Sequence, residues 1–126
     1  MKYLGVDYGT KRIGIAVSDE GGTFALPRAV VETKEAPAFI RELAMKEAIG
    51  TIVIGDTRSL SGASNTITEE METFKADLAG SIPIPVETIW EAWSSHEAGR
   101  FAPEKAKDDS AAAAVILQRY LDMRKS

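Results

Sequence analysis

Two short apolar segments at the start of the chain, separated by a glycine-containing turn, set the strongest limit on its fold. Residues 2–7 and 13–18 each have the length and apolar content of a strand, and residues 8–12 between them supply a turn. This spacing predicts an antiparallel hairpin. Asp7 ends the first strand, where an acid between apolar residues and a glycine turn has few structural reasons to be present.

The rest of the chain alternates strands with helices. We expect strands at residues 24–31, 51–54 and 86–89, and helices at residues 36–48, 66–79, 94–101 and from 108 or 110 to about 124. Pro27 favours an edge position for the third strand, and Thr33 is a candidate N-cap for the first helix. Strands separated by helices pair in parallel. The predicted fold is therefore α/β, a five-stranded mixed sheet with helices on both faces, in a single domain over residues 1–126.

Composition excludes several classes of protein. The chain has no cysteine, which excludes disulfides, thiolate metal sites and cysteine nucleophiles. Its longest apolar runs, such as residues 111–117, are far shorter than the roughly 20 residues that span a bilayer. The N-terminus has no apolar secretion segment, so we expect a cytoplasmic protein without a membrane partner. A formal net charge of −4 argues against holding nucleic acid by bulk charge alone.

The polar residues that could carry chemistry are carboxylates near the ends of the predicted elements. Ligands gather at the carboxyl ends of strands in open α/β sheets. The candidates there, and at the start of the last helix, are Asp7, Asp56, Glu91 and Asp109. Converging carboxylates repel one another unless a hard cation such as Mg²⁺ lies between them. Two such ions would suit phosphodiester cleavage. The alternative is that each acid is only a helix cap, a turn former or a surface group.

Residues 7–19, DYGTKRIGIAVSD, form the most specific stretch. Gly9 permits a tight turn beside Asp7, and Lys11 and Arg12 place positive charge there, suitable for phosphate. The stretch resembles the first phosphate motif of actin-like and sugar-kinase ATPases. Those proteins enclose a nucleotide between two large domains, which 126 residues cannot supply. A small ATPase therefore stays a minor alternative.

At the N-terminus of so short a chain, the same stretch resembles the YqgF/RuvX family. Residues 52–62, with Gly55 and Gly62, and residues 109–122 are similar to two further segments of that family, so the resemblance covers nearly the whole chain. It implies an RNase H-like fold and Asp7, Glu91 and Asp109 as catalytic carboxylates that bind Mg²⁺ or Mn²⁺. The four alanines that follow Ser110 would let the last helix approach the sheet and bring Asp109 toward Asp7.

Two positions depart from the family pattern. The family's arginine after the last strand is Ala92 here, and its Gly-Leu-Pro is Gly55-Asp56-Thr57. A methyl group cannot replace a guanidinium beside a phosphate. We therefore expect Arg58 to supply the lost cation, together with Lys11 and Arg12 as substrate-binding residues. Related RNase H-like resolvases carry an acid at the end of the corresponding strand, which makes Asp56 a candidate fourth metal ligand.

The resemblance implies a metal-dependent nuclease, a hydrolase of phosphodiester bonds in structured nucleic acid. Processing of the 5′ end of pre-16S rRNA in ribosome biogenesis is the first expectation. Resolution of Holliday junctions in branched DNA is the second, and a non-catalytic nucleic-acid-binding module is a third alternative. The sequence leaves open whether the protein is a monomer or a homodimer.

Overall fold

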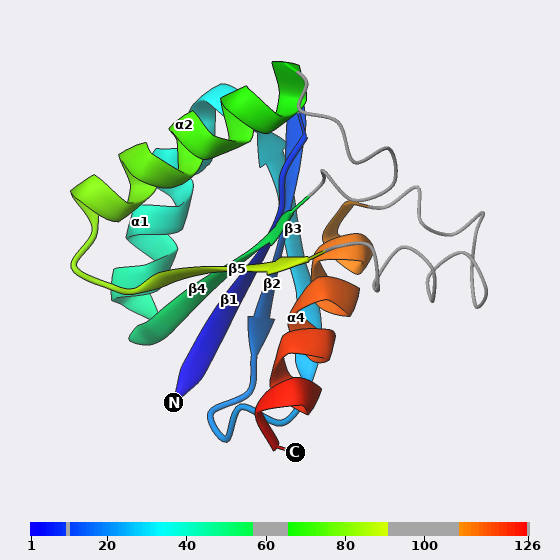
Figure 1. The fold of residues 1–126 in the computed structure, drawn as a ribbon. Helices are drawn as coiled ribbons and strands as arrows, with labels where there is room; N and C mark the ends of the chain where they lie inside the picture. The colour runs from blue at the N-terminus through cyan, green and yellow to red at the C-terminus, as the bar shows by residue number, and fades with distance from the viewer. Residues whose placement is uncertain (10, 57–65, 91–108, 126) are drawn as a thin grey trace.

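The computed structural model describes residues 1–9, 11–56, 66–90 and 109–125, which form one sheet and the helices around it (Figure 1). In chain order its elements are β1 (Lys2–Asp7), β2 (Arg12–Ser18), β3 (Ala25–Glu32), the 3-10 helix η1 (Thr33–Glu35), α1 (Ala36–Lys46), β4 (Ile49–Asp56), α2 (Thr66–Ser81), β5 (Val86–Trp90) and α4 (Asp109–Lys125). This order confirms the predicted one. The helix expected at residues 94–101 lies outside the described residues.

The five strands lie in the order β3-β2-β1-β4-β5. β1 pairs antiparallel with β2, and β2 pairs antiparallel with β3, which confirms the predicted hairpin. β4 pairs in parallel with β1 on one side and with β5 on the other. The sheet is therefore mixed, as predicted. β3 is an edge strand, where the missing N–H of Pro27 is tolerated.

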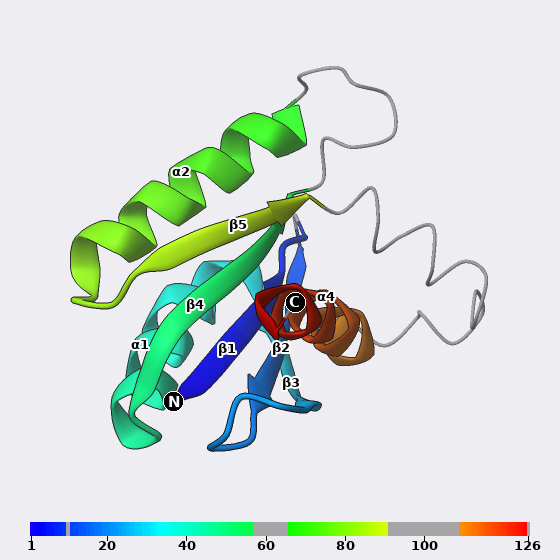
Figure 2. The same cartoon turned by 60° about the horizontal axis from the view of Figure 1, so that its bottom comes forward.

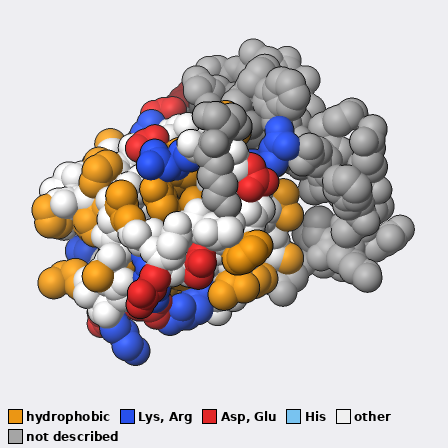
Figure 3. Space-filling view, turned by 90° about the horizontal axis from the view of Figure 1, so that it is seen from below, with side chains coloured by type: hydrophobic (Ala, Val, Ile, Leu, Met, Phe, Trp, Pro, Cys, Tyr) orange, Lys and Arg blue, Asp and Glu red, His pale blue; other side chains and the backbone are white. Residues whose placement is uncertain are grey.

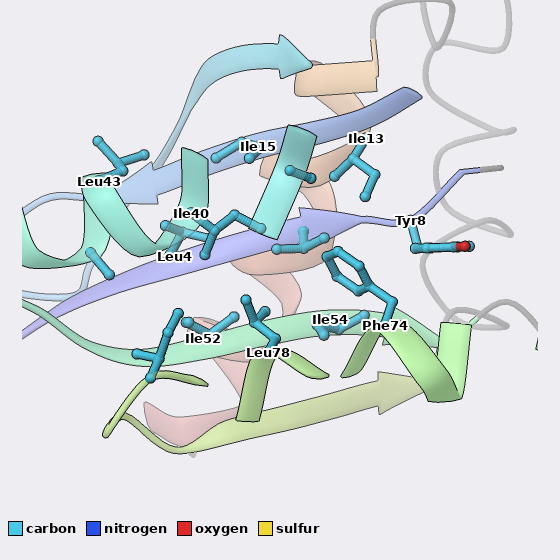
Figure 4. Close-up of a cluster of buried hydrophobic side chains, with 14 of the residues drawn as sticks. Leu4, Tyr8, Ile13, Ile15, Ile40, Leu43, Ile52, Ile54, Phe74 and Leu78 are labelled. Atoms are coloured by element: carbon cyan, nitrogen blue, oxygen red, sulfur yellow. The ribbon is translucent and has the colours of Figure 1, made fainter. Parts of the chain in front are cut away.

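Helices cover both faces of the sheet (Figure 2), and each face has its own buried hydrophobic cluster. α1 and α2 lie on one face, where Leu4 and Val6 of β1 pack into the cluster drawn in Figure 4. α4 covers the other face, where Tyr3 of β1 packs against the helix. The alternation of these β1 side chains follows from the two-residue period of a strand.

α4 approaches the sheet unusually closely at Gly5 of β1. A Cβ atom added at Gly5 would lie 2.7 Å from Leu117 Cβ and 3.1 Å from the carbonyl oxygen of Ala113. Towards the amino end of β1, the ring of Tyr3 lies 5.8 Å from the ring of Tyr120. Because the later helix residues meet the earlier strand residues, α4 runs antiparallel to β1. Glycine in the strand and small residues in the helix together make this packing possible.

Ion pairs link side chains near the end of the sheet where β1, β4 and β5 begin, which we call the amino edge. Glu47, which follows α1, accepts a hydrogen bond from Lys2 Nζ at 3.1 Å and two from the guanidinium of Arg28 in β3. Charged side chains of both signs lie interspersed with hydrophobic ones over this end of the molecule (Figure 3). Among the helices that the structure describes, none has both the length and the apolar composition to cross a membrane.

Gly5→Ala should destabilise the protein by about 1–3 kcal/mol, because the new methyl group overpacks the contact with α4. Gly80→Ala in α2 is the matched control, since a Cβ atom there would meet nothing within 4 Å. That change should raise the free energy of unfolding by up to about 1 kcal/mol, as alanine favours a helix over glycine. Urea unfolding measures both. Equal effects of the two substitutions would contradict the close contact at Gly5.

The pKa of Glu47 is lowered from its ordinary 4.5, first by the hydrogen bond from Arg28, although burial opposes the shift. A carboxyl group with a lowered pKa stabilises the fold above its ordinary pKa, and this contribution is lost as the pH falls through the lowered value. Wild type should therefore be more stable than Glu47→Gln at pH 7, by less than about 1 kcal/mol for such partly exposed pairs. The difference should vanish in acid. Urea unfolding from pH 7 to 3 measures it, and a constant difference would contradict the ion pairs.

Candidate active site

Acidic residues stand at the carboxyl ends of two neighbouring parallel strands. β1 ends at Asp7 and β4 ends at Asp56. The two strands are in register at Val6 and Ile54, so both ends reach the same edge of the sheet. β5 ends there too, since Trp90 lies opposite Asp56. The structure thus confirms that Asp56 ends the strand beside β1, although β4 is longer than the predicted 51–54.

The first turn of α4 lies at this same edge. Since the helix runs antiparallel to β1, and Ala113 and Leu117 pack on Gly5, the residues before Ala113 extend toward Asp7. Asp109 opens the helix four residues earlier, which is about 6 Å further along its axis. Ser110 beside it is buried. The backbone packing therefore directs the start of α4 toward the end of β1, and the approach of the Asp109 side chain to Asp7 stays a prediction.

The structure describes part of the predicted carboxylate set. Asp7 is half-buried. The side chains of Asp56 and Asp109, and the whole of Glu91, Ala92 and Arg58, lie outside the described residues. Within the described part of the chain, no group of three or more histidine, aspartate or glutamate side chains lies close enough to hold a metal ion. Glu91 directly follows Trp90 in the sequence.

A residue outside the hairpin, Thr33, forms hydrogen bonds with the turn between β1 and β2. A Cβ atom at Gly9 would lie 2.4 Å from the carbonyl oxygen of Arg12, so the chain folds back on itself there and needs glycine. Thr33, the first residue of η1, donates its hydroxyl hydrogen to Gly9 O at 2.7 Å. Its backbone N–H donates to Lys11 O at 3.0 Å. Lys11 and Arg12 are exposed on this fastened turn, beside Asp7.

This use of Thr33 corrects the sequence prediction. The sequence pattern makes Thr33 a cap for the helix at residues 36–48, yet α1 has Glu35 as its N-cap, without a side-chain capping bond. The Thr33 hydroxyl bonds instead to a residue 24 positions earlier in the chain. No local pattern could have indicated this contact, because it depends on how β3 returns alongside β2.

Tyr8 anchors the end of β1 to α2. Its ring is buried against Phe74, with the ring centroids 5.3 Å apart, while its hydroxyl points away from the hydrophobic cluster (Figure 4). Burial, and secondly the negative charge of Glu70, raise the pKa of Tyr8 above 10.0. Tyr8 therefore stays protonated at neutral pH, and its contribution is to fix the strand that carries Asp7.

Comparison with known protein families identifies the chain. The model of the RuvX family, described as Holliday junction resolvase, matches residues 1–123. The chain belongs to the RuvX family. Among its curated relatives is a protein of Maridesulfovibrio salexigens named "Putative pre-16S rRNA nuclease". The two are 36% identical over 132 aligned positions, which cover 96% of this chain and 98% of the relative.

Solved structures show that this RuvX-family chain has an RNase H-like fold. It matches Thermus thermophilus RuvC in complex with a Holliday junction substrate with a TM-score of 0.69, at 15% identity, over 100% of this chain and 96% of the other. A ROK hexokinase from Thermus thermophilus matches with a TM-score of 0.51 at 24% identity. The match covers 81% of this chain and 38% of the kinase chain, and it shows a likeness of fold alone.

Proposed function

We propose that this protein is a nuclease that depends on a divalent metal ion and hydrolyses phosphodiester bonds in structured nucleic acid. Its proposed substrate is the precursor of 16S rRNA, processed at the 5′ end during ribosome biogenesis in the cytoplasm. The observation that carries the proposal is the meeting of β1, β4, β5 and the first turn of α4 at one edge of the sheet. The name of the near full-length relative supports the choice of RNA.

Asp7, Glu91 and Asp109 are the proposed metal ligands and catalytic carboxylates, with Asp56 as a fourth ligand. The donor set fits Mg²⁺ or Mn²⁺, because these hard cations prefer carboxylate oxygens. Asp7 and Asp56 end neighbouring strands, and Asp109 opens the helix that packs across Gly5. Acids so arranged on three elements would repel one another without a cation.

Different residues of the chain would have different roles in hydrolysis. A bound divalent ion would supply acidity to a water molecule and offset the charge of the phosphate. Lys11, Arg12 and Arg58 are proposed to bind phosphate oxygens and orient the strand beside the carboxylates. Water adds to phosphorus, one P–O bond breaks, and the leaving oxygen takes up a proton. Because Ala92 stands where the family has an arginine, these three cationic side chains would make the contact with phosphate that the guanidinium makes in the family.

A Holliday junction in DNA is the second candidate substrate. The description of the matching family favours it, as does a fold shared with RuvC. Cleavage of a four-way DNA junction and of a pre-16S 5′-leader RNA, measured side by side, separates the two candidates. The junction becomes the substrate if the DNA is cut faster than the RNA.

Asp7→Asn should abolish cleavage of the leader RNA in Mn²⁺ or Mg²⁺, with a loss of at least about 100-fold, because an uncharged amide is a poor ligand for a hard cation. Asp77→Asn makes the same chemical change at an exposed residue of α2 and should leave the rate unchanged. Gel analysis of end-labelled RNA measures both. Wild type that binds the RNA but cuts no faster than Asp7→Asn would establish the non-catalytic binding module instead.

Asp56→Asn tests the fourth ligand. Loss of even an outer-shell partner weakens metal binding about 10- to 100-fold, so removal of a direct ligand should weaken Mn²⁺ binding by at least about tenfold. Isothermal titration with Mn²⁺ and the cleavage rate measure the effect, again with Asp77→Asn as the control. If metal affinity and cleavage both match wild type, Asp56 has no place in the site.

A further inference from the structure

Thr33 fastens the turn that follows Asp7 with two hydrogen bonds. Its hydroxyl donates to Gly9 O at 2.7 Å and its backbone N–H donates to Lys11 O at 3.0 Å. Both distances are typical of well-formed hydrogen bonds. The hydroxyl serves no helix cap, since neither η1 nor α1 has a side-chain capping bond. Its described contact is therefore with the turn.

The contact with Thr33 acts on a turn whose two ends are fixed by strand pairing. The hairpin fixes Asp7 opposite Gly14, and Arg12 lies opposite Glu32 of β3 at the last paired position. Between them, the chain folds back so tightly that Gly9 meets the carbonyl oxygen of Arg12. Thr33 then holds one carbonyl of the turn through its side chain and another through its backbone.

We propose that Thr33 is a positioning residue for nucleic-acid binding. Its hydroxyl holds the Gly9 carbonyl so that Lys11 and Arg12, both exposed, project beside Asp7 toward the phosphates of the substrate. The inference rests on the proposed function, because it assigns Thr33 a part in that same site. A turn that is already ordered loses less conformational entropy when its cations bind phosphate. Without the hydroxyl, more of that ordering has to occur on binding.

Two substitutions separate the hydroxyl from the rest of the residue. Thr33→Val removes the hydroxyl, keeps the shape of the side chain and leaves the backbone N–H for Lys11. Thr33→Ser keeps the hydroxyl and should behave as wild type. Thr73→Val is the matched control, because it removes an exposed hydroxyl that donates to Glu69 O at 3.1 Å within α2.

Steady-state cleavage of the 5′-leader RNA in Mn²⁺, over a range of KCl concentrations, gives the functional readout. In Thr33→Val we expect KM to rise about tenfold, the equivalent of about one hydrogen bond, with kcat within twofold of wild type. The dependence of log kcat/KM on log salt should become less steep by about 0.7 to 0.9 for each phosphate that the variant no longer neutralises. A merely destabilised fold would not change that slope.

Hydrogen exchange followed by mass spectrometry gives a readout that needs no catalysis. The peptide containing Gly9, Lys11 and Arg12 should exchange faster in Thr33→Val than in wild type, Thr33→Ser or Thr73→Val. Unchanged exchange overturns the inference, and so does faster exchange with unchanged KM and salt slope. A wild type that neither binds nor cuts the RNA overturns the proposed function and the inference with it. A wild type that cuts normally while Thr33→Val matches it overturns the inference alone.

Discussion

The contact between Gly5 of β1 and the stretch of α4 around Ala113 and Leu117 determines where the first turn of α4 lies relative to the end of β1. With no side chain on the strand and small side chains early in the helix, the two backbones come close enough that one added methyl group would clash. The contact fixes the position of α4 along the axis of β1. It therefore also fixes how far the backbone at the first residue of α4 extends toward the end of β1.

The two edges of the sheet have different roles. At the amino edge, Glu47 binds Lys2 and Arg28, and the guanidinium of Arg124 lies over the rings of Tyr3 and Tyr120, so these charged side chains are paired or stacked. At the carboxyl edge, where β1, β4 and β5 end, lie Asp7, Asp56 and the start of α4. Lys11 and Arg12, which follow Asp7 in the hairpin, are exposed. Two divalent ions at that edge would bring the formal net charge from −4 to about zero. The net negative charge of the chain is then compatible with a nucleic-acid substrate that is bound only at this edge.

The sequence predicts the order of the elements well and the strand bounds to within about two residues, because both depend on local patterns. Asp7 and Asp56 follow apolar runs, and the chain continues directly into a turn or loop, so their positions at strand ends can be read from residue order. Gly5 stands out in the sequence only as part of a strand, since its importance depends on a helix more than 100 residues later. The prediction for Thr33 is wrong for the same reason: a hydroxyl can cap its own helix or reach a distant carbonyl, and only tertiary packing decides. The placement of Glu91, Arg58 and Ala92 stays a prediction.

Anomalous diffraction from a crystal soaked in Mn²⁺ tests the central claim most directly. We expect an anomalous peak at the carboxyl edge, coordinated by Asp7 and by at least one of Asp56, Glu91 and Asp109. A crystal of Gly5→Ala under the same conditions should show a weaker peak, because the added methyl group moves α4 away from β1. No peak beside Asp7 in wild type, or a peak bound by other residues, would contradict the claim that this edge is a metal-dependent nuclease site.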